Sequence, residues 1–362
     1  VPVWLVAAPL DDGSLWVAVL DDGRVEAFEV RGGSVTPADL APNRLPTGMP
    51  PVLLETTDGF AVLEPGPDAS TATHPVWLAQ TRTLAYVATN GDLVVAREGS
   101  GVQRLALNAL PDARILVDER ERLLLLTGAT DQRYDHGVLG DTLEAALITL
   151  VETSPDLRVA AHLSLPEPKV VEGISPIWVD LDGDGTRETI VTVSDRFQGA
   201  QVLVYSESGE IVAAGPAIGQ GFRWRHQLAV GPFGPQGEIE FADLLTPHIG
   251  GVVVFYSMVD QNLRDVSSVP GYSSHEYGSR NLDMALAGDF DADGQLELLV
   301  PNQQRNQLAA VQHKPGGAVE DWLLPLDGHL SSNLMAVELP DGQLALGAGR
   351  VDKVLRLWLP GE

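Results

Sequence analysis

Short apolar runs separated by turn-forming residues recur along the chain. Between residues 175 and 214, the runs IWVDL, ETIVTV, AQVLVY and EIVAAG are separated by DGDG, SDRFQG and SESG. These runs are rich in β-branched and aromatic residues, as strands are. No segment longer than ten residues has a clear helical period, although GDTLEAALITLV at 140–151 has a weak one and equally fits a strand. The pattern predicts an all-β protein made of four-stranded antiparallel units.

A short sequence core marks the start of several of these units. The pattern Pro-[Val/Ile]-Trp-[Leu/Val] occurs in VPVWLVA, HPVWLAQ and SPIWVDL, which begin at Val1, His74 and Ser175. A weaker copy, PPVLLET, begins at Pro50, and copies without the Pro-Trp pair begin at His226, Ser279 and Ser331. Regular repetition of four-stranded units is typical of a β-propeller. Two β-sandwiches, the structural alternative, would not space the Pro-Trp copies evenly.

The spacing predicts a single β-propeller domain over residues 1–362. Seven blades are expected, with eight as the alternative, and they cover residues 1–46, 74–108, 110–168, 172–220, 224–270, 279–327 and 331–362. The remaining segment, 47–73, is expected to form an extra hairpin or a partial blade.

The composition narrows the possible partners and the location. The net charge is −27, and only three of the 23 basic residues are lysines (Lys169, Lys314 and Lys353), so nucleic acid is excluded as a partner. Without cysteine there is neither a disulfide nor a thiolate metal site. No apolar run approaches the roughly 18 residues of a transmembrane segment. The chain opens on VPVWLVAAPL, which suggests that a signal peptide has been removed and that the protein is extracellular or periplasmic.

Two acidic loops carry the most specific chemical signal. VDLDGDGTRETI places carboxylates at loop positions 1, 3, 5 and 9 and a glycine at position 6, and DFDADGQLE repeats this spacing. Such alternation suits a hard cation with six to eight oxygen ligands, so we expect two Ca²⁺ sites. A single loop could be a solvated Asp-Gly turn, but two equivalent loops favour metal. The expected ligands, counting the carbonyls at position 7, are Asp180, Asp182, Asp184, Thr186, Glu188, Asp289, Asp291, Asp293, Gln295 and Glu297.

Both loops lie between the expected first and second strands of a blade and resemble the loops of FG-GAP or VCBS-type calcium-binding β-propellers, including the integrin alpha head. They are not EF-hands, because no glutamate stands at position 12 and no helices flank them. The resemblance implies that each ion has a structural role and holds one hairpin together. In ELPDGQLAL, Leu339 replaces an aspartate although Asp341 and Gly342 are kept, so this loop is not expected to bind.

Basic and aromatic residues gather in the expected second-to-third strand loops and inter-blade segments. One interpretation is that the arginines bridge to Asp131, Asp195 and Asp352 and join neighbouring blades. The other is an anion pocket, in which guanidinium groups hold carboxylate or sulfate. A histidine metal site is disfavoured, because no two histidines share a short ligand spacing. The ligand-binding candidates are Arg133, His136, Arg196, Arg225, His226, His248, His275, Arg280, Arg305 and Arg350.

Three functional hypotheses follow from this pattern. The first is a non-enzymatic, calcium-stabilised binding module for an anionic glycan or a protein ligand, since no nucleophile or phosphate-loop motif occurs. The second is a polysaccharide lyase acting on a uronate glycan, with arginine neutralising the carboxylate. Its catalytic candidates are His226, His248, His275, Tyr134, Tyr272 and Tyr277. The third is a scaffold without a small ligand, and the fold does not choose between these.

Overall fold

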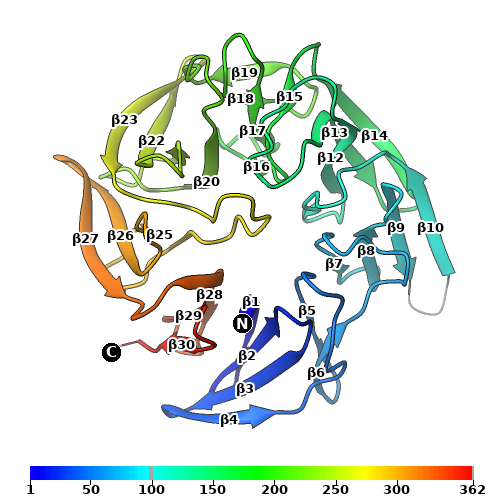
Figure 1. Ribbon diagram of the computed structural model, residues 1–362, viewed down its shortest axis with the longest axis vertical. Coiled ribbons are helices and arrows are strands. Elements are labelled where there is room, and N and C mark those ends of the chain that lie inside the picture. Colours follow the sequence, from blue (N-terminus) through cyan, green and yellow to red (C-terminus); the bar gives the residue numbers. More distant parts are fainter. Residues whose placement is uncertain (98–100, 361–362) are drawn as a thin grey trace. The chain divides into compact units, whose positions relative to one another are not determined.

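The computed structural model describes residues 1–97 and 101–360, in which thirty β-strands and no helix occur (Figure 1). The all-β prediction is therefore confirmed. No helix in these residues has the length and apolar character that crossing a membrane requires. The chain divides into two compact units. The first comprises Val1–Glu64, Gly271–His275 and Asn281–Glu362, and the second comprises Pro65–Pro270 and Glu276–Arg280.

The first unit contains three antiparallel meanders and one hairpin. One four-stranded sheet contains β1 (Pro2–Leu10), β2 (Gly13–Leu20), β3 (Val25–Arg31) and β4 (Ser34–Ala38). The other contains β24 (Leu286–Gly288), β25 (Glu297–Pro301), β26 (Gln307–Lys314) and β27 (Gly317–Pro325). A three-stranded sheet contains β28 (Leu330–Glu338), β29 (Leu344–Arg350) and β30 (Leu355–Trp358). The segment 47–73 includes the hairpin of β5 (Val52–Thr56) and β6 (Gly59–Leu63).

The second unit contains four further groups of four strands. They are β7 (Val76–Leu78), β8 (Thr83–Val87), β9 (Asp92–Arg97), β10 (Gly101–Ala106); β11 (Leu116–Val117), β12 (Leu123–Thr130), β13 (Glu144–Glu152), β14 (Arg158–Ser164); β16 (Ile177–Val179), β17 (Glu188–Ser194), β18 (Gln201–Tyr205), β19 (Ile211–Ala214); and β20 (Arg225–Gly231), β21 (Glu240–Leu245), β22 (Val252–Val259), β23 (Asn262–Pro270). The last three groups are linked into one sheet, because β15 (Val170–Val171) pairs with both β13 and β17, and β19 meets β23.

The four strands expected between residues 175 and 214 are β16–β19, each antiparallel to the next. The ambiguous segment 140–151 contains most of β13, so its weak helical period does not reflect its structure. Pairing with β12 on one side and β14 on the other supplies the hydrogen bonds that a helix would have made internally.

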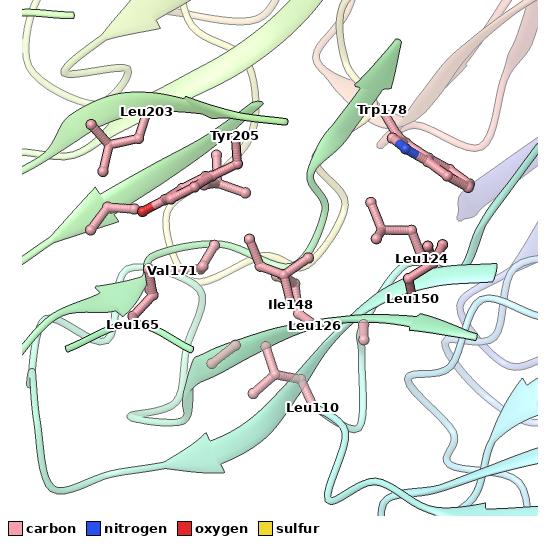
Figure 2. Packing of buried hydrophobic residues seen from close by; sticks show 14 residues of the cluster. Leu110, Leu124, Leu126, Ile148, Leu150, Leu165, Val171, Trp178, Leu203 and Tyr205 are labelled. Atoms are coloured by element: carbon pink, nitrogen blue, oxygen red, sulfur yellow. The ribbon is translucent and has the colours of Figure 1, made fainter. Parts of the chain in front are cut away.

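The repeated tryptophans pack between strands. Trp178 is 7% exposed and belongs to an apolar cluster with Leu124, Ile148 and Leu150 (Figure 2). The guanidinium groups of Arg122 and Arg187 each lie 5.6 Å from its ring centre. Trp4 belongs to a separate cluster in the first unit, and its Nε1–H donates to the carbonyl of Gly48 (2.8 Å). The large apolar area that a tryptophan ring buries is consistent with its recurrence in the repeat.

Candidate metal centres and ligand surface

The first acidic loop connects β16 to β17 and is folded by its own aspartates. The backbone N–H groups of Gly183 and Gly185 donate to the two carboxylate oxygens of Asp180, at 2.7 and 2.9 Å. Both glycines have a positive φ, 79° and 86°, which other residues adopt only with strain. The N–H of Leu181 donates to Oε2 of Glu188 (2.9 Å), and this hydrogen bond holds the last carboxylate of the loop close to its beginning.

Three carboxylates of this loop converge. One oxygen from each of Asp180, Asp182 and Glu188 lies within 4.8 Å of the others. Asp184 is not part of this group; its Oδ1 accepts hydrogen bonds from the backbone N–H (2.7 Å) and the hydroxyl (2.5 Å) of Thr186. Burial, followed by the neighbouring aspartates, raises the pKa of Glu188. The crowding of carboxyl groups therefore disfavours their charged forms.

The second acidic loop connects β24 to β25 and brings four carboxylates together, those of Asp289, Asp291, Asp293 and Glu297. Glu297 is fully buried. It accepts from the N–H of Phe290 (2.7 Å) and from Nε2 of Gln312 (2.5 Å). Burial, with the negative charges of Asp291 and Asp293, raises its pKa to about 7.

The two loops share one hydrogen-bond scheme. The position-6 glycine, Gly185 or Gly294, donates to Oδ2 of the position-1 aspartate, and the position-2 N–H donates to Oε2 of the position-9 glutamate. The position-7 N–H donates to the position-5 aspartate in both. In the loop around Asp341 the N–H of Gln343 donates to Asp341, but the N–H of Gly342 donates to the carbonyl of Leu339 and not to a carboxylate, and Asp341 belongs to no carboxylate group in the described residues. The carbonyls of Thr186 and Gln295 remain predicted ligands.

Several predicted ligand-binding arginines instead hold the fold together. Arg133 donates to the carbonyls of Leu165 (3.0 Å) and Lys169 (3.2 Å). Arg280 pairs with Asp112 (2.7 Å) and with Asp141, and Arg350 pairs with Asp352 and donates to the carbonyl of Leu326.

Asp131 and Asp195 have other hydrogen-bond partners than the arginines that the sequence predicts. Asp131 accepts from Gln132, and Asp195 caps the backbone N–H groups of Phe197 and Gln198. Arg196 is exposed, and its guanidinium lies 5.2 Å from the ring centre of Phe197.

Five candidates are corrected because they are buried: Arg225, His275 and Tyr272, and also Tyr134 (4% exposed) and His226 (7% exposed). Arg225 is 1% exposed, pairs with Asp243 at 2.7 Å and donates to the hydroxyl of Tyr256 (2.5 Å). It is the first residue of β20, and its partners Asp243 and Tyr256 lie on the next strands of the same sheet, β21 and β22. His275 is 0% exposed, so neither residue can meet a soluble ligand at a surface. Tyr272 is also buried, and its hydroxyl donates to Glu320 (3.2 Å).

Aromatic side chains from several loops of the second unit meet. The ring of Phe222 lies 5.5 Å from that of Tyr134 and 5.3 Å from that of His136, and Trp224 stacks on His226 at 5.2 Å. His248 contacts the ring of Tyr277 edge-on, also at 5.2 Å. We call this set the aromatic surface; it comprises the exposed Phe222 and Tyr277, the half-buried His136 and His248, and the buried Tyr134, Trp224 and His226.

Backbone hydrogen bonds join the loops that carry the aromatic surface. The N–H of Thr246 donates to the carbonyl of Trp224 (2.9 Å), and that of Gly278 donates to the carbonyl of Val138 (3.1 Å). The N–H of Gly219 donates to Gln198, which places the Arg196 loop beside the segment leading to Phe222. Phe222 and Tyr277 are 52% and 65% exposed, so apolar rings face solvent here. Sequence reasoning identified the histidines and tyrosines of this set but passed over Phe222, which stands in the same FRWRHQ segment.

The candidate basic residues, which the sequence places in equivalent loops of successive blades, are divided between the two units. Arg305 and Arg350 belong to the first unit, whereas the aromatic surface belongs to the second. A common rim, the seven-blade count and the single domain therefore stay predictions.

Comparison with known proteins identifies the fold. No protein-family model matches the chain, and no curated protein does. Among solved structures, the chain is similar to one titled "Structure of Dos1 propeller", with a TM-score of 0.50 and 10% identity over 99% of this chain and 83% of that one. Another, "Streptogramin B lyase structure", has a TM-score of 0.45 and 11% identity over 99% and 93%. With its successive antiparallel meanders and the likeness to the Dos1 propeller, the chain is a protein of the β-propeller fold.

Proposed function

We propose that this protein is an exported, calcium-stabilised β-propeller of the FG-GAP or VCBS type that binds an anionic glycan through the aromatic surface. The binding of calcium is supported by the hydrogen bonds that the two acidic loops share. In each loop, oxygens from at least three carboxylates lie close together. Oxygen-only ligands, a sharp glycine turn and a nine-residue span favour Ca²⁺ over the softer transition metals.

Each ion would join the first and second strands of one sheet. The residues that hold it come from the loop and from the first position of the second strand, Glu188 in β17 or Glu297 in β25. An ion that binds the folded chain and not the unfolded chain stabilises the fold by about 2.7 kcal/mol when its free concentration is 100 times its Kd. Calcium therefore acts here as a structural cofactor.

Direct calcium titration tests this part. Isothermal titration calorimetry on chelator-treated protein is expected to give two ions per chain for the wild type and one for Asp289→Asn. Asp341→Asn is the matched control, since it changes the same residue type in the loop that lacks the scheme, and it is expected to keep both ions. No calcium uptake by the wild type, or an equal loss in the control, would contradict the proposal.

The ligand part depends on the exposed rings and the nearby positive charge. Phe222, Tyr277 and Phe197 are all more than half exposed, and Arg196 and Arg223 are exposed beside them. Exposed aromatic groups and arginine together are typical of binding surfaces. The rings offer flat apolar area for the C–H face of a sugar, and the guanidinium groups offer partners for its carboxylates or sulfates.

A glycan array, run in calcium, tests this part. The wild type is expected to bind acidic glycans, and Phe222→Ala is expected to lower the signal at least tenfold. Ile211→Ala, which removes an equally exposed apolar side chain from β19, is the control and is expected to leave the signal unchanged. If the array is negative but a protein ligand is retained through Phe222, the glycan assignment is wrong and the surface is a protein-binding one.

A further inference from the structure

A buried carboxylate fixes one histidine of the aromatic surface. The side chain of Glu172 is 0% exposed; its Oε1 contacts Nδ1 of His136, and its Oε2 accepts the hydroxyl proton of Ser194. The backbone of Glu172 is held as well, because its N–H donates to Thr192 (2.9 Å) and its carbonyl accepts from Nε1 of Trp224 (3.0 Å). Both oxygens of the carboxylate are thus engaged, and its position is set by neighbouring strands.

This contact decides what His136 offers to a ligand. A carboxylate only accepts, so Nδ1 carries the proton and the neutral ring has its lone pair on Nε2. The side chain of His136 is 14% exposed. Within the described residues, its hydrogen bond to Glu172 is made through Nδ1. An imidazole oriented by a buried carboxylate, with the second nitrogen available, is the arrangement of a general base.

The surroundings of His136 are those of a ligand site. Phe222, whose ring lies 5.3 Å from the imidazole, is half exposed and has a φ of 51°, the left-handed region that bulky residues rarely adopt. Such strain persists only where the surroundings impose it, and it is concentrated at functional sites. Tyr134 lies 6.1 Å from His136; burial, followed by the charges of Glu172 and Glu144, raises the pKa of this tyrosine.

We infer that His136 is the general base of an elimination reaction on the anionic glycan, and that Glu172 positions it. This inference rests on the proposed function, since it needs the glycan at the aromatic surface. In a uronate ring, the C5–H beside the carboxylate is the acidic bond.

The step is balanced without any cofactor. Nε2 of His136 takes the C5 proton, and the C5–H electron pair forms the C4=C5 double bond. The C4–O bond breaks, and the leaving oxygen takes a proton from a solvent water. The hydroxide that remains is neutralised by the proton that the His136 imidazolium then releases. Positive charge from the exposed Arg196 and Arg223 favours the carbanion-like charge that develops on the carboxylate.

The experiment uses the full chain in calcium with polygalacturonate and alginate, and it measures both binding and the ultraviolet absorbance of the conjugated double bond. We expect product from the wild type and a loss of about 100-fold or more in kcat for His136→Gln, which is the usual effect of removing a general base. Polymer binding should change little in this variant. His162→Gln is the control, since this histidine lies on β14 and contacts Thr149.

Glu172→Gln tests positioning. Because an amide can present its N–H₂ group to Nδ1, the variant is expected to lower kcat, leave KM similar and shift the pH profile of kcat/KM. A wild type that binds polymer without forming product overturns the inference and leaves the proposed function intact, as does full activity in a folded His136→Gln. Absence of binding to any acidic polymer overturns the proposed function itself.

Discussion

At the second acidic loop, a rise in pH should lower the free energy of unfolding and calcium should raise it. The substitution Glu297→Gln should reduce both effects. Glu297 is fully buried, and its pKa of about 7 lies above the ordinary value of 4.5. A carboxyl group whose folded pKa is raised makes its full contribution below the unfolded pKa, and this contribution is lost as pH rises through the folded pKa. Without calcium, the fold therefore loses stability as the pH rises from about 4.5 to about 7, because over this interval the unfolded chain releases the proton of Glu297 and the folded chain keeps it.

The shift from 4.5 to about 7 corresponds to a loss of up to about 3 kcal/mol in the free energy of unfolding by pH 8. Glutamine cannot ionise, so in chelator at pH 8 the Glu297→Gln variant should be more stable than the wild type by up to this amount. At pH 5 the advantage should fall below about 1 kcal/mol, because the wild-type carboxyl is still protonated in the folded chain. In calcium at 1,000 times the Kd the order should reverse, since the variant has lost a charged ligand and the wild type gains about 4.1 kcal/mol, which exceeds the variant's advantage in chelator.

Urea unfolding followed by tryptophan fluorescence, in chelator and in calcium at pH 5 and pH 8, measures these four differences. Glu338→Gln, at the exposed end of β28, is the matched control and should behave as the wild type does. The reasoning is refuted if chelator and calcium give the wild type the same unfolding curve. It is also refuted if Glu297→Gln gains as much from calcium as the wild type.

Three further predictions concern buried groups of the second unit. Arg225→Met leaves Asp243 buried without its partner and should cost about 3–5 kcal/mol in urea unfolding, whereas the exposed Arg223→Met should change stability by less than about 0.5 kcal/mol. Trp178→Ala removes a repeat tryptophan from its apolar cluster and should cost about 3–5 kcal/mol by the same measurement. Burial, followed by the charge of Glu172, raises the pKa of Glu144, so stability is lost as pH rises from the unfolded value toward the folded one. Over that interval wild-type stability should fall by about 1.4 kcal/mol per pH unit relative to Glu144→Gln, and parallel pH profiles would contradict this.

The two clusters of carboxylates could be predicted from the sequence because their residues are local, whereas their binding of a metal stays a prediction. All carboxylates of a loop lie within nine positions, and the glycine at position 6 has the positive φ that the turn requires. Only the orientation of Asp184 was beyond the sequence, because the hydroxyl of Thr186 competes for the same carboxylate oxygen. That competition depends on rotamers and not on spacing.

The basic residues could be predicted only in part, because their roles depend on which side of a strand they occupy. Arg223 and Arg225 stand two positions apart in FRWRHQ, yet the first is exposed and the second is buried against Asp243. The segment begins in a loop and becomes a strand at Arg225, so the alternation that predicts exposure within a strand did not apply across this boundary.

By itself, the sequence determined the strand pattern, the repeat with its tryptophan, and the two acidic loops. Each of these depends on neighbours within a few residues, through alternation of polar and apolar side chains or through turn geometry. The tertiary structure alone decided that Glu172 meets His136, 36 positions away, and that Phe222 joins Tyr134. Such contacts depend on how sheets and loops pack, because burial of a charge or a ring is set by what other segments place around it and not by its own sequence neighbours.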